Sequence, residues 1–273
     1  MARFLQHKEE AYWFYRYLSI GYDRWVNPWF YTAPMRDSGL ELARLDRRDL
    51  DVVDVGAGTG FATEGIVKHV DPVRVHALDQ SDYQQAKAKK KETLRGVNFY
   101  LGDAEQLPWE TDRFDRYVSS GSIEYWPDPQ RAIAEAYRIL KADGQATILG
   151  PIQPKSVIGR FLAETFMLFP TIDEYLAWYK TAGFVDVTYR LLRPDWVRNE
   201  DYALSITGRK PAPGPSPWKA PTAAPAESLK AKTSSRKSRI LFLTRFALGS
   251  LAGGLFIPIA MAKTAFRKIA PGN

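Results

Sequence analysis

The chain has 273 residues, of which 45% are hydrophobic, which suits one sizeable α/β domain with appendages or two small domains. It contains no cysteine, so disulfides, thiolate metal sites and cysteine nucleophiles are excluded. The net charge of +7 is uneven, because residues 208–273 carry twelve Lys or Arg and one acid, whereas residues 1–207 carry 26 basic and 30 acidic residues. With no nucleic-acid recognition motif beside it, this basic tail favours an anionic membrane surface and argues against nucleic acid as a partner.

The N-terminal region is rich in aromatic residues interleaved with charges. Residues 1–30 predict one or two helices that end near Asn27 and Pro28, and residues 34–46 predict another amphipathic helix. We expect residues 1–45 to form a helical lid. Acids occur early and no long apolar run follows, so we expect neither a secretory signal nor a transit peptide in this chain.

Strands and helices alternate through the middle of the sequence. Strands are expected at residues 51–55, 74–79, 97–101, 114–119, 145–149, 185–192 and 202–209, and helices at residues 61–69, 83–94, 129–140, 155–169 and 171–182. This alternation predicts an α/β fold with a doubly wound, mostly parallel sheet and helices on both faces, over residues 46–209. The apolar helix at 155–169 predicts core packing, with some positions open to an apolar channel.

The C-terminal part changes composition twice. Residues 211–225 are rich in Pro and Ala, and we expect them not to pack, so residues 210–239 are predicted to form a linker that becomes basic. Residues 246–262 contain no charge, a length at the short edge for a membrane-spanning helix. Residues 240–273 therefore predict a C-terminal membrane anchor.

A glycine-rich turn, VVDVGAGTG, follows the first predicted strand. Gly56, Gly58 and Gly60 allow positive φ and close approach of a ligand to the backbone. A dinucleotide fold would need the spacing G-x-G-x-x-G, and the carboxylate of Asp54 would repel a diphosphate. Asp54 suits a ligand with an ammonium group and a sulfonium, so the turn favours S-adenosylmethionine.

Acidic residues end the next two strands. Asp79, at the end of the second strand, can take both ribose hydroxyls of either nucleoside cofactor. Asp103 follows the third strand, and its carboxylate can accept a hydrogen bond from the adenine amino group. The alternative interpretation is that Asp103 forms an Asx turn at the strand end. Their neighbours Gln80 and Ala104 also belong to the predicted cofactor-binding set, to which Tyr22 is added below.

Several segments together resemble a known family. VVDVGAGTG, LDQS, GDAEQLPW and LKADGQATILGP look like successive motifs of the Rossmann-like class I methyltransferases. GSIEYWPDPQR is the most specific of the stretches that narrow the resemblance to the plastid 2-methyl-6-phytylbenzoquinol and 2-methyl-6-solanesylbenzoquinol methyltransferases. The resemblance covers almost the whole chain. We expect two departures from that family, namely no transit peptide in this sequence and a tail that keeps only the general apolar pattern.

The resemblance implies C-methylation of a prenylated benzoquinol ring in tocopherol and plastoquinone synthesis. It implies a chloroplast membrane location, the inner envelope, with the catalytic domain on the soluble side. A methyltransferase for a ubiquinone or menaquinone precursor or a sterol stays an alternative, as does a membrane-anchored protein that binds the cofactor without catalysis. The oligomeric state is left open.

The loop after the fourth strand is expected to face the transferred methyl group. Ser122, Glu124 and Tyr125 are the catalytic candidates, and Glu124 is the residue that could hold or deprotonate a quinol hydroxyl. Its alternative role is that of a solvated loop acid. Tyr125 and Trp126 could stack on the ring or pack under the loop, and residues 127–129 are expected to cap the next helix.

Two further candidates lie near the N-terminus. The pair Tyr22 and Asp23 resembles the Tyr-Asp pair that quinone methyltransferases place over the cofactor, with a core aromatic as the alternative. His7 is a candidate base, whereas His69 is expected to be solvated and His76 structural. Isolated histidines without cysteine predict no metal site.

Overall fold

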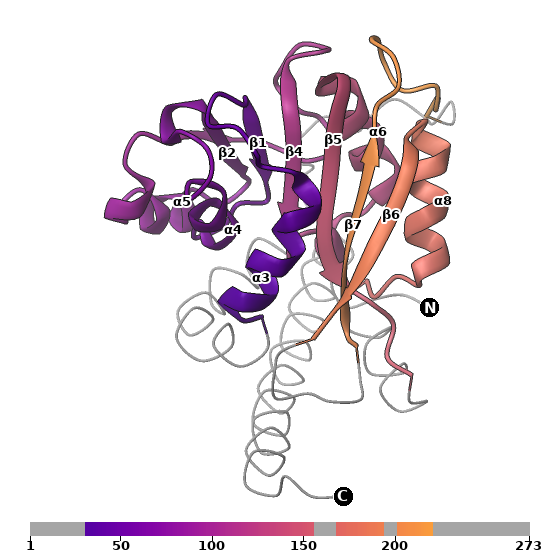
Figure 1. The fold of residues 1–273 in the computed structure, drawn as a ribbon, viewed down its shortest axis with the longest axis horizontal. Helices are drawn as coiled ribbons and strands as arrows, with labels where there is room; N and C mark the ends of the chain where they lie inside the picture. The colour runs from indigo at the N-terminus through magenta and orange to yellow at the C-terminus, as the bar shows by residue number, and fades with distance from the viewer. Residues whose placement is uncertain (1–30, 156–167, 194–200, 221–273) are drawn as a thin grey trace, which may run out of the picture.

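The computed structural model describes residues 31–155, 168–193 and 201–220, and seven strands form one sheet there (Figure 1). The strand order is β3-β2-β1-β4-β5-β7-β6. The strands are β1 (Val52–Val55), β2 (Val75–Asp79), β3 (Asn98–Leu101), β4 (Phe114–Ser120), β5 (Leu140–Pro151), β6 (Val185–Leu192) and β7 (Ala203–Arg209). Strands β1 to β5 pair in parallel, and β7 is antiparallel to β5 and β6. The predicted doubly wound, mostly parallel sheet is confirmed.

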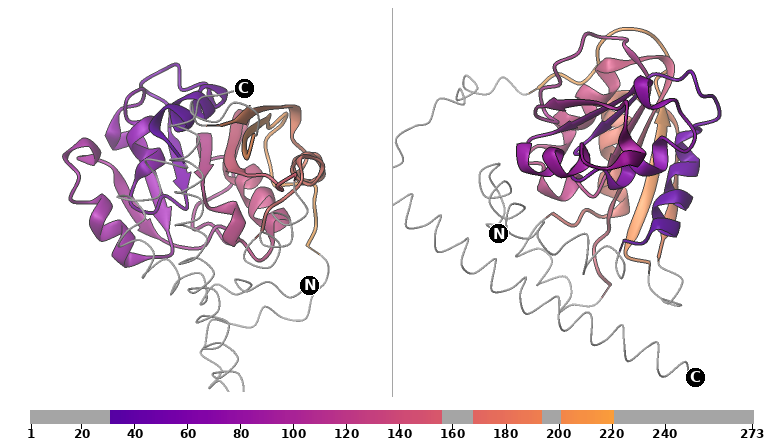
Figure 2. Two further views of the ribbon diagram at one scale, coloured as in Figure 1. Left: turned by 90° about the horizontal axis from the view of Figure 1, so that it is seen from below. Right: turned by 90° about the vertical axis from the view of Figure 1, so that its left-hand side faces the viewer.

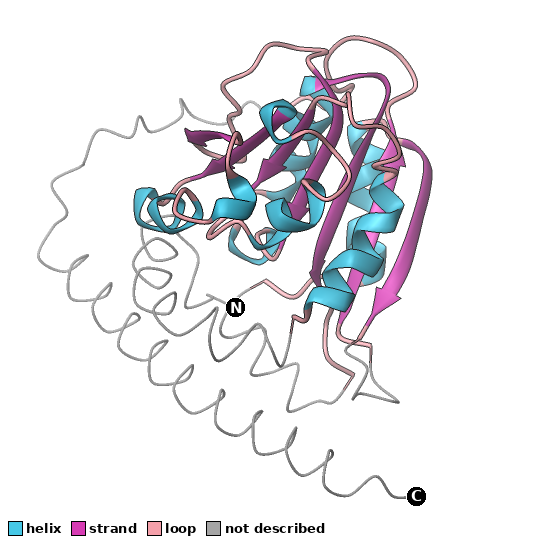
Figure 3. Ribbon diagram, turned by 60° about the vertical axis from the view of Figure 1, so that its left-hand side comes forward, coloured by secondary structure: helices cyan, strands magenta, loops and turns pink. Residues whose placement is uncertain are grey.

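Helices cover both faces of this sheet (Figure 3). The α-helices are α3 (Ala33–Leu40), α4 (Phe61–Ile66), α5 (Asp82–Ala88), α6 (Pro129–Ile139) and α8 (Ile172–Ala182). Short 3₁₀ helices are η2 (Glu41–Ala43), η3 (Pro72–Arg74), η4 (Glu92–Leu94) and η5 (Ile123–Tyr125). Buried side chains of α3 and α4 pack with β1 and β2 on one face, and those of α6 and α8 pack with β4, β5 and β7 on the other.

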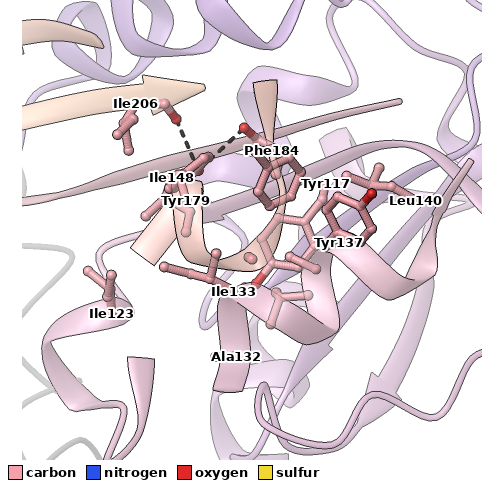
Figure 4. Close-up of a cluster of buried hydrophobic side chains, with 14 of the residues drawn as sticks. Tyr117, Ile123, Ala132, Ile133, Tyr137, Leu140, Ile148, Tyr179, Phe184 and Ile206 are labelled. Atoms are coloured by element: carbon pink, nitrogen blue, oxygen red, sulfur yellow. Dashed lines mark hydrogen bonds between the residues drawn. The ribbon is translucent and has the colours of Figure 1, made fainter. Parts of the chain in front are cut away.

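The core on the α6 and α8 face is rich in large buried aromatic residues, among them Tyr117, Tyr179 and Phe184 (Figure 4). The Tyr179 hydroxyl lies 3.2 Å from the carbonyl oxygen of Ile206, to which it donates a hydrogen bond. This bond satisfies a polar group that would otherwise be buried at a cost. Helix α8 begins at a capping box formed by Thr171 and Glu174 and ends at Gly183, whose φ is +99°. The sequence therefore fixes both ends of α8.

The lid predicted over residues 1–45 stays a prediction. Of its described part, Met35, Leu40 and Ala43 are buried in the core on the α3 and α4 face. Helix α3 packs against β5, β6 and β7, and η2 packs against β4, β5 and β7. Residues 1–30 of the predicted lid lie outside the described residues.

The predicted boundary between the helix at 129–140 and the next strand is also corrected. Helix α6 ends at Ile139, and β5 begins at Leu140, which pairs with Phe114. Asp143 and Gly144, which lie between the predicted helix and the predicted strand, are inside β5, where Asp143 has φ +61° and the register shifts. Pairing with β4 thus extends the strand beyond the apolar run from which it was predicted.

Two predicted segments lie largely or wholly outside the described residues. The first is the apolar helix expected at 155–169, of which most is not described. The second is the membrane anchor predicted at 240–273, of which nothing is described. Across the parts of the chain that the structure describes, no helix has the length and apolar character needed to cross a membrane.

The start of the predicted linker packs on the domain, which corrects the expectation that it does not pack. The Lys210 side chain is fully buried, and its Nζ lies 2.6 Å from Asp112 Oδ1 and donates to the carbonyl oxygens of Leu140 (2.7 Å) and Gly214 (2.6 Å). Ser216 Oγ donates to the carbonyl of Ala182 at 2.8 Å. The sequence did not reveal this contact because Asp112 lies 98 residues before Lys210.

We expect Asp112→Asn to destabilise the fold by about 2 kcal/mol. Removing one partner of a buried ion pair leaves the other charge uncompensated, although Asp112 itself is 32% exposed, which lowers the cost. Urea unfolding at pH 7 measures the change. Asp143→Asn is the control, because Asp143 is exposed in its ion pair with Arg209 and its loss should leave the unfolding midpoint unchanged. Equal midpoints for both variants and the wild type would contradict the role of Asp112.

Candidate active site

The predicted site residues gather at one edge of the sheet, where the parallel strands β1, β2 and β4 end. In the parallel register Val55 pairs with Leu78 and Ser120 pairs with Leu149, so the turns after these strands lie together. The strands β4 and β5 run downward in Figure 1, and the left view of Figure 2 looks onto this edge. Ligands of open α/β sheets bind at this edge.

The glycine-rich turn is fixed by hydrogen bonds to the neighbouring strand. Gly56 N–H donates to the Leu78 carbonyl at 2.8 Å, and Gly58 N–H donates to Asp79 Oδ2 at 2.8 Å. The φ angles of Gly56 and Gly58 are +75° and +55°, a region that side chains disfavour. A Cβ on Gly56 would also overlap the side chain of Ser122. Glycine is therefore required here on two separate grounds.

Asp54 lies on β1 just before this turn and is fully buried. Its Oδ2 accepts a hydrogen bond from Thr63 Oγ1 at 2.6 Å, and its Oδ1 has no partner among the described residues. Burial raises the pKa of Asp54 to about 7, and the nearby Asp79 adds to the effect. A positively charged group beside Oδ1 would favour the ionised form.

Asp79 ends β2 and holds the glycine turn through both of its oxygens. Oδ2 accepts from Gly58 N–H and Oδ1 accepts from Ser81 N–H, both at 2.8 Å. Burial raises the pKa of Asp79, while these bonds from Ser81 and Gly58 oppose the change. Each carboxylate oxygen has a further lone pair, so Asp79 can also accept from ribose hydroxyls. Gln80, the next residue, is exposed.

Asp103 follows β3 and forms the local turn that was the alternative interpretation. Its Oδ1 accepts from Glu105 N–H at 3.0 Å, and Gln106 N–H donates to its carbonyl. One carboxylate oxygen is thus used to shape the turn, and this bond does not decide whether Asp103 binds adenine. Ala104 is partly buried against the core on the α6 face.

The loop after β4 touches the glycine turn through Ser122. Ser122 packs against Gly56, and its Oγ accepts from the indole nitrogen of Trp126 at 2.9 Å. Trp126 is buried in the core, so of its two predicted roles the structure places it under the loop. Tyr125 is half-buried at the end of η5. Asp128 caps α6 as expected, accepting from Arg131 N–H at 3.1 Å.

Glu124 lies in η5 and is buried, which overturns its alternative role as a solvated loop acid. Its Oε2 has no hydrogen-bond partner among the described residues, and burial raises its pKa to about 7. Gly121, with φ +62°, lies next to the carboxyl, since a Cβ there would be in van der Waals contact with Glu124 Oε1 at 3.9 Å. A buried carboxyl that titrates near neutral pH is suited to proton transfer.

The structure describes two of the three histidines, and neither follows β1, β2 or β4 at this edge. His69 is exposed, and His76 packs in an aromatic cluster with its Nδ1 3.2 Å from the Tyr100 hydroxyl, as expected for solvated and structural residues. Burial lowers the pKa of His76. His7 and the pair Tyr22 and Asp23 lie outside the described residues. Within the described ranges, no three His, Cys, Asp or Glu side chains are grouped to hold a metal ion.

Two described residues at the site were missed in the sequence. Gln84 Oε1 lies 2.6 Å from the position that a Cβ on Gly58 would take, so this buried side chain borders the glycine turn. Tyr31 contacts Phe61 and Ser120, on either side of the site. Neither residue belongs to a motif. The only available signal was the position of Gln84 in the first turn of a helix that follows Asp79.

The residues at this edge fit S-adenosylmethionine. The orphaned Oδ1 of buried Asp54 suits an ammonium group, the glycine turn leaves room that a Cβ would fill, and Asp79 offers a carboxylate for the ribose. A dinucleotide would bring its diphosphate against Asp54, so the donor set argues for the sulfonium compound.

Comparison with known proteins agrees with this geometry. The family model described as "Methyltransferase domain" matches residues 53–148. The chain is 51% identical to the chloroplastic 2-methyl-6-phytyl-1,4-hydroquinone methyltransferase of Arabidopsis thaliana over 95% of this chain and 77% of that protein. It is 49% identical to the protein of the same name from Spinacia oleracea, over 95% of this chain and 76% of that protein.

Solved structures agree on the fold. Geranyl diphosphate C-methyltransferase from Streptomyces coelicolor A3(2), in complex with Mg²⁺, geranyl diphosphate and S-adenosyl-L-homocysteine, superposes with a TM-score of 0.55. The match covers 65% of this chain and 77% of that chain at 16% sequence identity. At this identity the likeness supports the class I methyltransferase fold alone.

Proposed function

The chain belongs to the family of 2-methyl-6-phytyl-1,4-hydroquinone methyltransferases, and from this premise we propose its reaction. It is a methyltransferase that transfers the methyl group of S-adenosylmethionine to a ring carbon of this prenylated hydroquinone, a step toward tocopherol. The observation that carries the assignment is 51% identity over 95% of the chain, a span that includes the loop with Glu124. We extend the proposal to the solanesyl analogue, on the path to plastoquinone, and to a plastid location.

The donor supplies an electrophilic methyl group when bound, and the chain has to align an acceptor carbon with it. We assign donor binding to Asp54, Asp79 and the glycine turn, with Gln80, Asp103 and Ala104 beside the adenine. The glycine turn is held in place because its N–H groups donate hydrogen bonds to β2. This helps to align the donor with the acceptor carbon, and most of the rate enhancement in such a displacement comes from alignment.

We assign proton transfer to Glu124. A ring carbon ortho to a phenol becomes nucleophilic as the phenol loses its proton, so a carboxylate within reach of that hydroxyl assists the reaction. The buried Oε2 has no partner among the described residues, and Gly121, which bears no side chain, lies beside the other carboxyl oxygen, Oε1. We assign Ser122 and Tyr125, from the same loop, to the acceptor side of the site. His7 stays the alternative base.

The test of the proposed function is a methylation assay with labelled S-adenosylmethionine. The acceptors are 2-methyl-6-phytyl- and 2-methyl-6-solanesyl-1,4-benzoquinol, a ubiquinone precursor, a menaquinone precursor and a sterol. We expect label on the ring of the two benzoquinols. Transfer only to one of the other acceptors would overturn the substrate assignment, and binding of the cofactor without any transfer would favour a non-catalytic role.

We also propose that residues 240–273 anchor the enzyme at a membrane, the inner envelope, with the catalytic domain on the soluble side. The support is in the sequence, where a basic stretch precedes the uncharged residues 246–262. A prenylated quinol resides in the bilayer, so anchoring raises its effective concentration at the site. Strand β7 ends at the edge of the sheet opposite the site (Figure 1).

Truncation after residue 220 should separate binding from delivery. We expect unchanged affinity for S-adenosylmethionine, unchanged turnover of a short-chain soluble quinol, and a loss of about tenfold or more in turnover of the phytyl quinol in liposomes. The cut must follow residue 220, because Gly214 and Ser216 bond to the domain. Full turnover on liposomes by the truncated chain would contradict the anchor.

A further inference from the structure

Tyr31 joins the two halves of the active site. Its hydroxyl lies 2.8 Å from Ser120 Oγ at the end of β4, and its ring centroid lies 5.7 Å from that of Phe61 at an interplanar angle of 56°. Phe61 directly follows Gly60 of the glycine turn, and Ser120 directly precedes Gly121, where the loop that carries Glu124 begins. One side chain therefore contacts the donor side and the acceptor side of the site.

The surroundings hold both contacts in place. The Arg36 guanidinium lies 4.8 Å from the centroid of the Phe61 ring, and its Nη1 donates to the Phe61 carbonyl at 3.0 Å. Arg36 is buried, so this end of α4 is firmly attached to α3. Burial raises the pKa of the Tyr175 hydroxyl, and Glu124 and Tyr31 both add to the effect.

The hydroxyl of Tyr31 has a role that packing does not explain. Tyr31 is only partly buried, and a phenylalanine would make the same ring contact with Phe61. The bond to Ser120, across 89 residues of sequence, needs the hydroxyl. It fixes the last residue of β4 relative to the glycine turn, at the point where the loop leaves the sheet.

We propose that Tyr31 is a positioning residue for methyl transfer, which holds the loop carrying Glu124 in register with the glycine turn through Ser120. This inference rests on the proposed function and assigns a residue outside the matched family model, which begins at residue 53. In-line displacement depends on the relative placement of two bound partners, and small displacements lower the rate of the chemical step more than the affinity for either partner.

The test is a double-mutant cycle of Tyr31→Phe and Ser120→Ala in the full chain, with the phytyl quinol as acceptor. We expect each single variant to lower kcat about 3- to 10-fold, the effect of one lost hydrogen bond, and the double variant to lower it no further. KM for the quinol and Kd for S-adenosylmethionine should stay within about twofold, and Tm should not follow kcat. Tyr189→Phe, an exposed tyrosine on β6, is the matched control and should have wild-type kcat.

Four results would overturn the inference. Wild-type kcat in Tyr31→Phe, or additive losses in the double variant, would remove the role of the bond. A fall in Tm and in both binding constants together with kcat would show a merely structural contact. If the wild-type chain transfers no methyl group to any quinol, the proposed function fails first and the inference falls with it, whereas an active wild type beside an unaffected Tyr31→Phe defeats only the inference.

Discussion

Glu124→Gln should lower kcat for quinol methylation by about 10²- to 10³-fold, the range in which a positioned acid or base contributes to a rate. Gln has almost the same shape and keeps the loop in place, but it cannot accept a proton. Affinity for S-adenosylmethionine should be unchanged, because the described donor-side contacts involve Asp54, Asp79 and the glycine turn. Calorimetry with the donor and single-turnover kinetics with the phytyl quinol separate the two effects.

Glu110→Gln is the matched control, since Glu110 is exposed and precedes β4 on the same chain segment. It should keep the wild-type rate. If both variants methylate the quinol at the wild-type rate, Glu124 is not the base, and His7 becomes the next residue to replace.

The pH dependence of the rate follows from the same carboxyl. A base is active when ionised, and burial raises the pKa of Glu124 to about 7, so kcat should rise with pH through about 7 in the wild type. The glutamine variant should lose this limb of the profile. A pH profile of the wild type that is flat between pH 5 and 8 would contradict the assignment.

Stability should depend on pH in the opposite direction. The folded state holds the Glu124 proton up to about pH 7, whereas the ordinary pKa is 4.5. The contribution of this group to the free energy of unfolding is therefore complete below pH 4.5 and is lost as pH rises to 7, a change on the order of 3 kcal/mol. At pH 8, Glu124→Gln should be more stable than the wild type in urea. The expected gain in stability beside a loss of rate distinguishes a functional carboxyl from a structural one.

The sequence was sufficient for features whose signal is local. The seven strands were predicted within a few residues, apart from the extension of β5, because apolar runs end in Gly or Asp turns. The glycine turn and Asp79 were placed correctly, since each follows its strand directly. The burial of Glu124 could not be read from a loop sequence with a polar and aromatic composition.

Features that depend on distant pairs were missed. Tyr31 meets Ser120 across 89 residues and Lys210 meets Asp112 across 98, and no motif marks either pair. The composition of residues 211–225 predicted a segment that does not pack, yet the Gly214 N–H donates to Asp112 and the Ser216 hydroxyl donates to the Ala182 carbonyl, two contacts that composition does not encode. Contacts between residues far apart in the sequence therefore attach Tyr31 and Lys210 to the rest of the fold.

Asp79→Asn should weaken binding of S-adenosylmethionine by about 10- to 100-fold. Both carboxylate oxygens accept backbone N–H groups, from Gly58 and Ser81 at 2.8 Å. An amide would turn an NH₂ group toward one of these donors, so it would free the glycine turn as well as remove the charge from the ribose site. Hydrogen bonds to charged groups contribute about 1.5 to 3 kcal/mol, which corresponds to this loss of affinity.

The control for this variant is Asp82→Asn, an exposed acid in the first turn of α5, which should bind the donor as tightly as the wild type. Titration of both variants and the wild type with S-adenosylmethionine and with NAD also separates the two cofactor classes. Asp79 could serve a ribose of either one, so its loss alone does not choose between them. Asp54 distinguishes the two cofactor classes, because it is buried just before the glycine turn, where a dinucleotide would bring its diphosphate. Binding of NAD in preference to S-adenosylmethionine by the wild type would therefore refute the assignment of this edge of the sheet, whatever Asp79→Asn does.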